Sequence, residues 1–183
     1  NGGAVGARAV ADAGADAAAA LRWSLSLRSC ELGDAGAATI ARALARDGLI
    51  ALDLSLCGIG LVGASDVLVA ASGSRTLISL SLCGNPLAAW AEGGAPPPGG
   101  WRRAAMALCG AVRTLATCSF DLLDLSACGL ESLPPLSGAR APTGTTYADE
   151  LRAAWRGRAV VATGRVSAAR GALVLRRTRF APE

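Results

Sequence analysis

The feature that most constrains the fold of this chain is a leucine-rich segment that occurs four times, at residues 22–32, 49–59, 77–87 and 120–130. Each copy contains two leucines two residues apart, then a Cys or Asn three residues later, then Leu or Ile. Residues two apart point to the same side of a strand, so each copy predicts a short strand with one buried face. One such unit cannot bury that face by itself, so the copies must stack side by side.

The stretches between the copies predict helices that return the chain to the start of the next strand. Apolar residues recur at three- and four-residue spacing in 33–48, and we expect equivalent helices over 60–72 and 101–117. Residues 3–20 resemble a further, degenerate copy of the same helix. The third return carries an insertion at about 91–100 that is rich in Gly and Pro, which predicts an exposed loop.

The four segments fit the pattern L-x-x-L-x-L-x-x-N/C-x-L, the first of them except at its first position, and so resemble leucine-rich repeat proteins. Their spacing of about 28 residues, with helical returns, is similar to the ribonuclease-inhibitor-like class of that family. The resemblance covers residues 1–136. It implies an α/β solenoid with a curved parallel sheet inside and helices outside. It also implies a binding or scaffolding role, without identifying the partner.

Residues 137–183 leave the repeat pattern and form a final helix followed by a basic segment. We expect the helix at 147–157, then strands at 159–166 and 172–180 joined by a turn at 167–171. A β-hairpin-like cap of this kind would cover the open end of the stack, with Leu173 and Leu175 facing the last repeat. Because the chain starts at Asn1 and within a repeat, we expect a processed protein or a piece of a longer one.

Composition and charge exclude several classes of function. The sequence has no His, which excludes Ser-His and Cys-His catalytic pairs and any histidine-ligated metal or haem. No run of about 18 strongly apolar residues is present, so we expect no membrane span. We therefore predict no catalysis and no cofactor. Residues 152–183 hold eight arginines and one acidic residue, Glu183, which indicates either an acidic partner or a solubilising tail.

The six cysteines follow the repeat rather than a metal-binding or disulfide pattern. Cys30, Cys57 and Cys128 occupy the same repeat position, and no pair has Cys-x-x-Cys spacing. We interpret these three as core residues, whereas Cys83 falls at an outward strand position beside the concave face. Without a secretory signal, this usage favours an intracellular, reducing compartment. Cytoplasm or cytoskeleton, in particular a cilium, is favoured, and an organelle is the alternative.

The candidate partner-binding residues fall into two groups. Outward strand positions predict a concave-face set: Trp23, Arg28, Asp53, Ser55, Ser81 and Asp124. The insertion and the C-terminus predict a second set: Trp101, Arg102, Arg103, Arg176, Arg177 and Arg179. Binding energy usually concentrates in Trp, Tyr and Arg, which few concave positions offer. The competing interpretations are a solvated strand face for the aspartates and local core filling for the tryptophans.

We interpret the chain as a non-enzymatic protein-binding scaffold, a structural subunit of a larger assembly such as a ciliary axoneme or an organellar complex. One alternative is a regulatory leucine-rich-repeat module that binds a GTPase or another signalling partner. A second alternative is accessory nucleic-acid contact through the Arg-rich C-terminus. Such contact would be driven mainly by phosphate charge and would depend steeply on salt.

Overall fold

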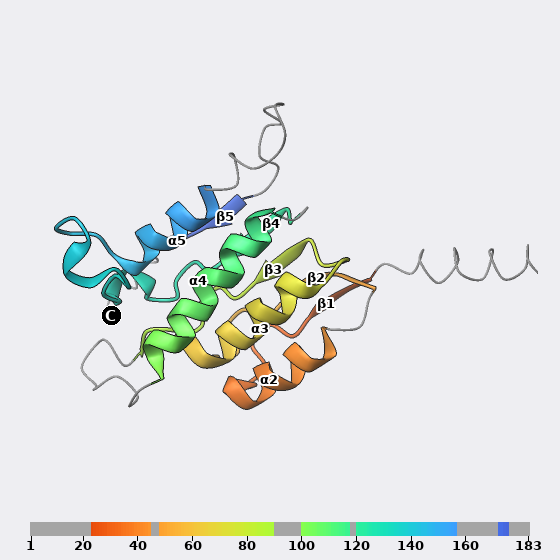
Figure 1. Cartoon of the computed structure of the whole chain (residues 1–183). Coiled ribbons are helices and arrows are strands. Elements are labelled where there is room, and N and C mark those ends of the chain that lie inside the picture. The colour runs from red at the N-terminus through yellow and green to blue at the C-terminus, as the bar shows by residue number, and fades with distance from the viewer. Residues whose placement is uncertain (1–22, 45–47, 90–99, 118–119, 157–171, 176–183) are drawn as a thin grey trace, which may run out of the picture.

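Figure 1 shows the protein as a computed structural model in which a row of helices lies along one face of a sheet. The structure describes residues 23–44, 48–89, 100–117, 120–156 and 172–175. Over these ranges the protein is α/β, with five parallel strands in one sheet and four α-helices. The α/β class and the parallel sheet agree with the sequence prediction.

The order of the strands in the sheet follows their order in the chain. The strands are β1 (Trp23–Ser26), β2 (Leu49–Asp53), β3 (Ser79–Ser81), β4 (Leu122–Asp124) and β5 (Ala172–Val174). All four neighbouring pairs are parallel. A parallel neighbour cannot be reached by a tight hairpin, so each connection crosses over the sheet before the next strand begins.

The strand register confirms the prediction that equivalent leucines lie side by side. One continuous row joins Leu25, Leu52, Leu80, Leu123 and Leu173 across the sheet. The three central leucines of this row are almost fully buried. The leucine spacing therefore sets both the pairing of the strands and the face that they bury.

The helices cover the buried face of the sheet in chain order (Figure 1). They are α2 (Gly33–Ala43), α3 (Leu61–Gly73), α4 (Trp101–Thr117) and α5 (Tyr147–Arg156), and each packs against its neighbour in the chain. The prediction for α4 has the observed bounds, whereas α2 ends earlier than expected. The helix expected at 3–20 and most of the insertion at 91–100 lie outside the described residues.

Among the described residues, one continuous hydrophobic core lies between the sheet and the helices. Tyr147, Leu151 and Trp155 of α5 are buried in it, and Leu173 and Leu175 pack against it. The C-terminal helix and β5 thus share the core of the repeats, rather than forming a separate one.

A residue with a left-handed backbone conformation ends the strand segment in all four copies. Ser29, Leu56, Gly84 and Ala127 have φ between 57° and 71°, and each directly precedes the Cys or Asn of its repeat. Three of the four are not glycine, although this conformation disfavours L side chains. The chain therefore repeats one turn geometry even where the residue type varies.

The Cys or Asn that follows this turn bonds to the backbone of the preceding repeat. Cys57 Sγ donates to Leu27 O at 3.0 Å, and Cys128 Sγ donates to Leu82 O at 3.2 Å. Asn85 does the same through Nδ2, which donates to Leu54 O at 2.8 Å. Burial raises the pKa of the Cys128 thiol to about 12, so the thiol stays a neutral donor. These side-chain hydrogen bonds join successive repeats, in addition to the backbone hydrogen bonds between the strands.

Cys30 departs from the expectation that it is a core residue. It is exposed, while Cys57 and Cys128 are buried. Cys57 and Cys128 each bond to a carbonyl of the repeat before them, whereas the residues before β1 lie outside the described part of the chain. Among the described residues, Cys30 Sγ makes only a long contact of 4.0 Å with Arg28 O.

Helices α2 and α3 approach closely at a glycine. A Cβ on Gly63 would lie 2.9 Å from the Ala37 Cβ and 2.6 Å from Asp34 Oδ1. The same Asp34 oxygen accepts hydrogen bonds from Gly60 N at 2.7 Å and Gly63 N at 3.2 Å. A carboxylate on one helix thus caps the N-terminus of the next, which a side chain at position 63 would obstruct.

The last strand differs in its pairing from a simple hairpin cap. β5 adds to β4 in parallel and extends the ladder by one more strand. The expected partner strand at 159–166 lies outside the described residues. Between β4 and α5, the chain forms two short 3-10 turns, at Leu130–Ser132 and Gly138–Arg140.

Candidate protein-interaction surface

The face of the sheet away from the helices carries two rows of polar side chains. Ser26, Asp53, Ser81 and Asp124 lie level with one another on β1 to β4, because they alternate with the buried leucine row. Two residues further along each strand segment, a second row follows: Arg28, Ser55, Cys83 and Ser126. We call these eight residues the polar strip. It contains five of the six predicted concave-face residues.

Two aspartates of the polar strip hold the ends of their own strands. Asp53 Oδ1 accepts a hydrogen bond from Ser55 N at 2.9 Å, and Asp124 Oδ1 accepts one from Ser126 N at 2.9 Å. Each side chain replaces the ladder partner that the backbone loses where the strand stops. The aspartates are therefore more than a solvated strand face, since each stabilises the turn that follows it.

The serines connect neighbouring repeats across the strip. The Ser55 and Ser81 hydroxyls lie 2.8 Å apart and are hydrogen-bonded, and Ser26 Oγ donates to Asp53 Oδ2 at a longer 3.4 Å. Ser55 is almost completely buried. Ser55 thus serves the sheet, and a partner would meet Asp53, Ser81 and Asp124, which are half-buried.

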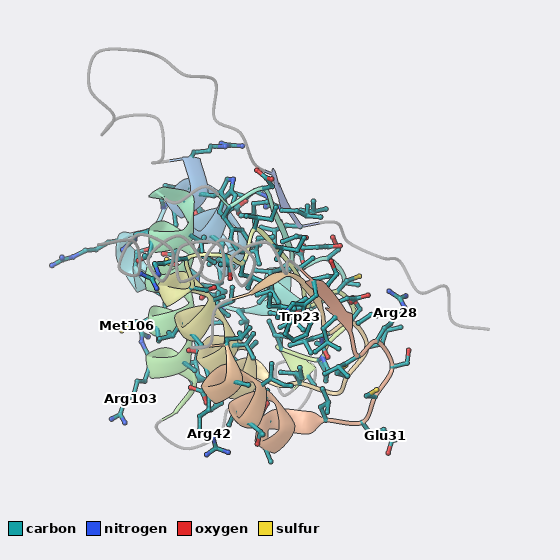
Figure 2. The ribbon with its side chains drawn as sticks, turned by 90° about the vertical axis from the view of Figure 1, so that its right-hand side faces the viewer. Trp23, Arg28, Glu31, Arg42, Arg103 and Met106 are labelled. Carbon is teal, nitrogen blue, oxygen red and sulfur yellow. The ribbon has the colours of Figure 1, made fainter. Side chains whose placement is uncertain are left out.

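One basic residue and one thiol occupy the second row. Arg28 is exposed and extends from the sheet side of the molecule, as Figure 2 shows. Cys83 is half-buried, and burial raises the pKa of its thiol, with the charge of Asp124 acting in the same direction. Cys83 therefore presents a neutral thiol beside two carboxylates and one guanidinium.

Trp23 does not continue these rows. It pairs with Leu49 across a break in the register between Trp23 and Ser24, so it is out of step with the residues that follow. Trp23 is the first residue of β1, at the opposite end of the strand from the polar strip. Its side chain is 52% exposed. The place of Trp23 in a partner-binding surface with Arg28 stays a prediction.

The residues predicted at the insertion lie on another side of the molecule. Arg103 and Met106 point outward from α4 on the helix side, opposite Arg28 (Figure 2). Arg102 Nη2 donates to Leu136 O at 2.8 Å, and its guanidinium lies 5.5 Å from the centre of the Trp101 ring. Arg102 and Arg103 are both exposed, and Arg102 ties the start of α4 to the segment after β4. Arg176, Arg177 and Arg179 lie outside the described residues.

The sequence analysis missed two polar residues of α5 that fasten the C-terminal part of the fold. Glu150 accepts hydrogen bonds from Leu136 N at 2.7 Å and from Ser137 N at 3.0 Å. Burial acts to raise the pKa of Glu150, but these hydrogen bonds hold it below its usual value. The buried Tyr147 hydroxyl donates to Ala105 O at 2.6 Å. The spacing of the repeats carries no signal for either contact.

No three His, Cys, Asp or Glu side chains in the described ranges come together as a possible metal site. None of the helices described is long and apolar enough to cross a membrane. The polar strip offers carboxylate and hydroxyl acceptors and one guanidinium to a partner.

Comparison of the sequence with protein-family models and with curated proteins finds no match.

Proposed function

We propose that this chain is a short leucine-rich-repeat solenoid that binds a protein partner through the polar strip, as a non-enzymatic scaffold of a larger assembly. The observation that carries the proposal is the row of equivalent leucines, Leu25 to Leu173, across five parallel strands in chain order. The four α-helices lie on the same face of the sheet, and we propose that the other face meets the partner (Figure 1).

The contacts between repeats support a solenoid rather than another parallel α/β arrangement. Cys57, Asn85 and Cys128 each reach a carbonyl of the repeat before them, and the same left-handed turn precedes each of them. Repeat proteins of this kind bury each unit against its neighbours and present one extended surface. The short polar strip is such a surface.

The side chains of the strip support recognition without catalysis. Asp53 and Asp124 each use Oδ1 to hold the following turn, and both side chains are half-buried rather than covered, so a donor on a partner can reach them. Because Ser81 lies between them and is small, a partner backbone can approach the sheet closely at this point. We place this scaffold in a reducing, intracellular compartment, because Cys30, Cys57 and Cys128 follow the repeat rather than a disulfide framework.

The test uses photocrosslinking from two matched positions in cells of the source organism. Ser24 is exposed on the sheet face, and Val69 is exposed on the outer face of α3. The full chain carries p-benzoylphenylalanine at one position or the other. We expect the chain to sediment with a large complex, and to give one crosslinked product of defined mass from Ser24 but not from Val69. A free monomer that crosslinks equally from both positions would contradict the proposal.

A further inference from the structure

Cys30 and Cys57 occupy equivalent positions in adjacent repeats. Leu27 N donates to Asp53 O at 2.8 Å and Ser29 N donates to Ser55 O at 2.9 Å, so the two segments run side by side beyond the strands. This register brings Cys30 level with Cys57. Neighbouring strands lie about 4.8 Å apart. Disulfides join Cα atoms that are about 4.4–6.8 Å apart, so the spacing suits a bridge.

The sulfur of Cys57 lies against the turn that carries Cys30. Cys57 Sγ donates to Leu27 O at 3.0 Å, and the same carbonyl accepts a hydrogen bond from Cys30 N at 3.1 Å. Cys30 itself is exposed, and its sulfur has only the 4.0 Å contact to Arg28 O among the described residues. Rotation about χ1 of Cys30 can therefore turn its sulfur toward Cys57 without disturbing a packed core.

The other described cysteines lack this arrangement. Cys128 faces Asn85 at the equivalent position of the preceding repeat, so it has no thiol neighbour there. Cys83 lies in the polar strip between Ser55 and Ser126. Within the described repeats, a thiol at both of two adjacent positions occurs at Cys30 and Cys57.

We propose that Cys30 and Cys57 form a thiol–disulfide modification site that is oxidised by a low-molecular-weight disulfide of the glutathione class. The exposed Cys30 thiolate attacks oxidised glutathione, which forms a mixed disulfide and releases one glutathione thiolate. The Cys57 thiolate then attacks the Cys30 sulfur, the bond to glutathione breaks, and the second glutathione leaves and takes up the proton from Cys57. Two protein thiols are oxidised and one small disulfide is reduced to two thiols.

The different environments of the two thiols set this order of events. Cys57 is fully buried, and burial raises the pKa of its thiol, which protects it from direct attack by a solvent oxidant. Cys30 is accessible and reacts first. When the bridge forms, Cys57 gives up its hydrogen bond to Leu27 O, and the adjoining turn must adjust. That turn carries Arg28 and Glu31, so oxidation alters the basic end of the polar strip.

The experiment treats the reduced full chain with oxidised glutathione under native conditions, blocks remaining thiols, and maps the tryptic peptides by mass spectrometry. Cleavage after arginine places Cys30 in peptide 29–42 and Cys57 in peptide 47–75, so a bridge joins two separate peptides. We expect the joined pair, lighter by two hydrogens than the reduced peptides and separated by a reductant. The Cys83→Ser variant is the matched control, and it keeps the bridge.

Two further variants separate the roles of the thiols. In Cys57→Ser the bridge is lost and Cys30 retains glutathione, whereas in Cys30→Ser the bridge is lost and Cys57 stays unmodified. Cys57 is buried, so Cys57→Ser can unfold the chain. Cys30 is exposed, so Cys30→Ser should leave the fold intact and still tests the proposal. Stable glutathione on Cys30 of the unaltered chain, a bridge from Cys30 to another cysteine, or modification of Cys57 without Cys30 would each overturn the proposal.

Discussion

Asn85 offers the most direct test of the contacts between repeats. The side chain is fully buried and makes four hydrogen bonds with two adjacent repeats. Its Oδ1 accepts from Cys57 N at 2.9 Å and Ile59 N at 3.1 Å, and its Nδ2 donates to Leu54 O and Leu82 O, both at 2.8 Å. Asn85→Ala removes all four bonds and leaves buried backbone groups without these partners.

The expected loss follows from the number of bonds. A neutral hydrogen bond contributes about 1 kcal/mol to stability, so Asn85→Ala should lower the free energy of unfolding by about 4 kcal/mol. That is a large part of the roughly 5–15 kcal/mol that holds a domain folded. Cysteine is a milder replacement for Asn85 than alanine, because Cys57 and Cys128 donate to a carbonyl from the same repeat position. Asn85→Cys keeps such a bond and should lose about 2–3 kcal/mol.

Urea unfolding of the full chain, followed by circular dichroism, measures both losses. Asp66→Asn, on the exposed face of α3, is the control and should change stability by less than about 0.5 kcal/mol. Hydrogen exchange should also speed up at the amides of Cys57 and Ile59, the two donors to Asn85. A loss below about 1 kcal/mol for Asn85→Ala, with both amides still protected, would refute the reasoning.

Three further changes test the helix contacts, each in the full chain by urea unfolding. Gly63→Ala should lose about 1–3 kcal/mol, because its Cβ would lie 2.9 Å from the Ala37 Cβ. The control Gly110→Ala, with nothing within 4 Å, should instead gain up to about 1 kcal/mol. The lowered pKa of Glu150 adds stability above the usual glutamate pKa, and this is lost as the pH falls through the folded value. Glu150→Gln should flatten that acid-side slope, and an unchanged slope would count against the hydrogen bonds to its carboxylate. Tyr147→Phe should lose about 1 kcal/mol, because the Ala105 carbonyl loses the hydroxyl donor that it has in addition to its partner within α4, and an unchanged stability would contradict this.

The periodic part of the fold could be predicted from the sequence because one physical rule generates it. Leucines two apart fix the buried face, and their recurrence fixes which strands pair and in what register. Thus the row through Leu52, Leu80 and Leu123 follows from spacing alone. The bounds of α4 follow in the same way, from a Gly- and Pro-rich stretch before it and apolar periodicity within it.

The contacts that could not be predicted are those that do not repeat. Trp23 does not continue the rows of the polar strip, because the strand register shifts between Trp23 and Ser24. That shift depends on the exact path of β1. Arg102 bonds to Leu136 O and Glu150 to Leu136 N, across a connection whose course no spacing sets. Cys30 occupies the repeat position at which Cys57 and Cys128 are buried, yet it is exposed, and the repeat spacing does not predict this difference.

The same distinction separates the residues of the polar strip that build the sheet from those that are available for function. Asp53 and Asp124 recur at one repeat position and hold the same turn, so changing either alters the fold as well as any interaction. Arg28 stands where the following repeats have Ser55, Cys83 and Ser126, and no recurring backbone contact explains an arginine there. Under the proposed function, the Arg28 guanidinium is the group of the polar strip that a partner can bind without altering a repeat turn. A partner of the sheet face should therefore depend on Arg28 far more than the stability of the chain does.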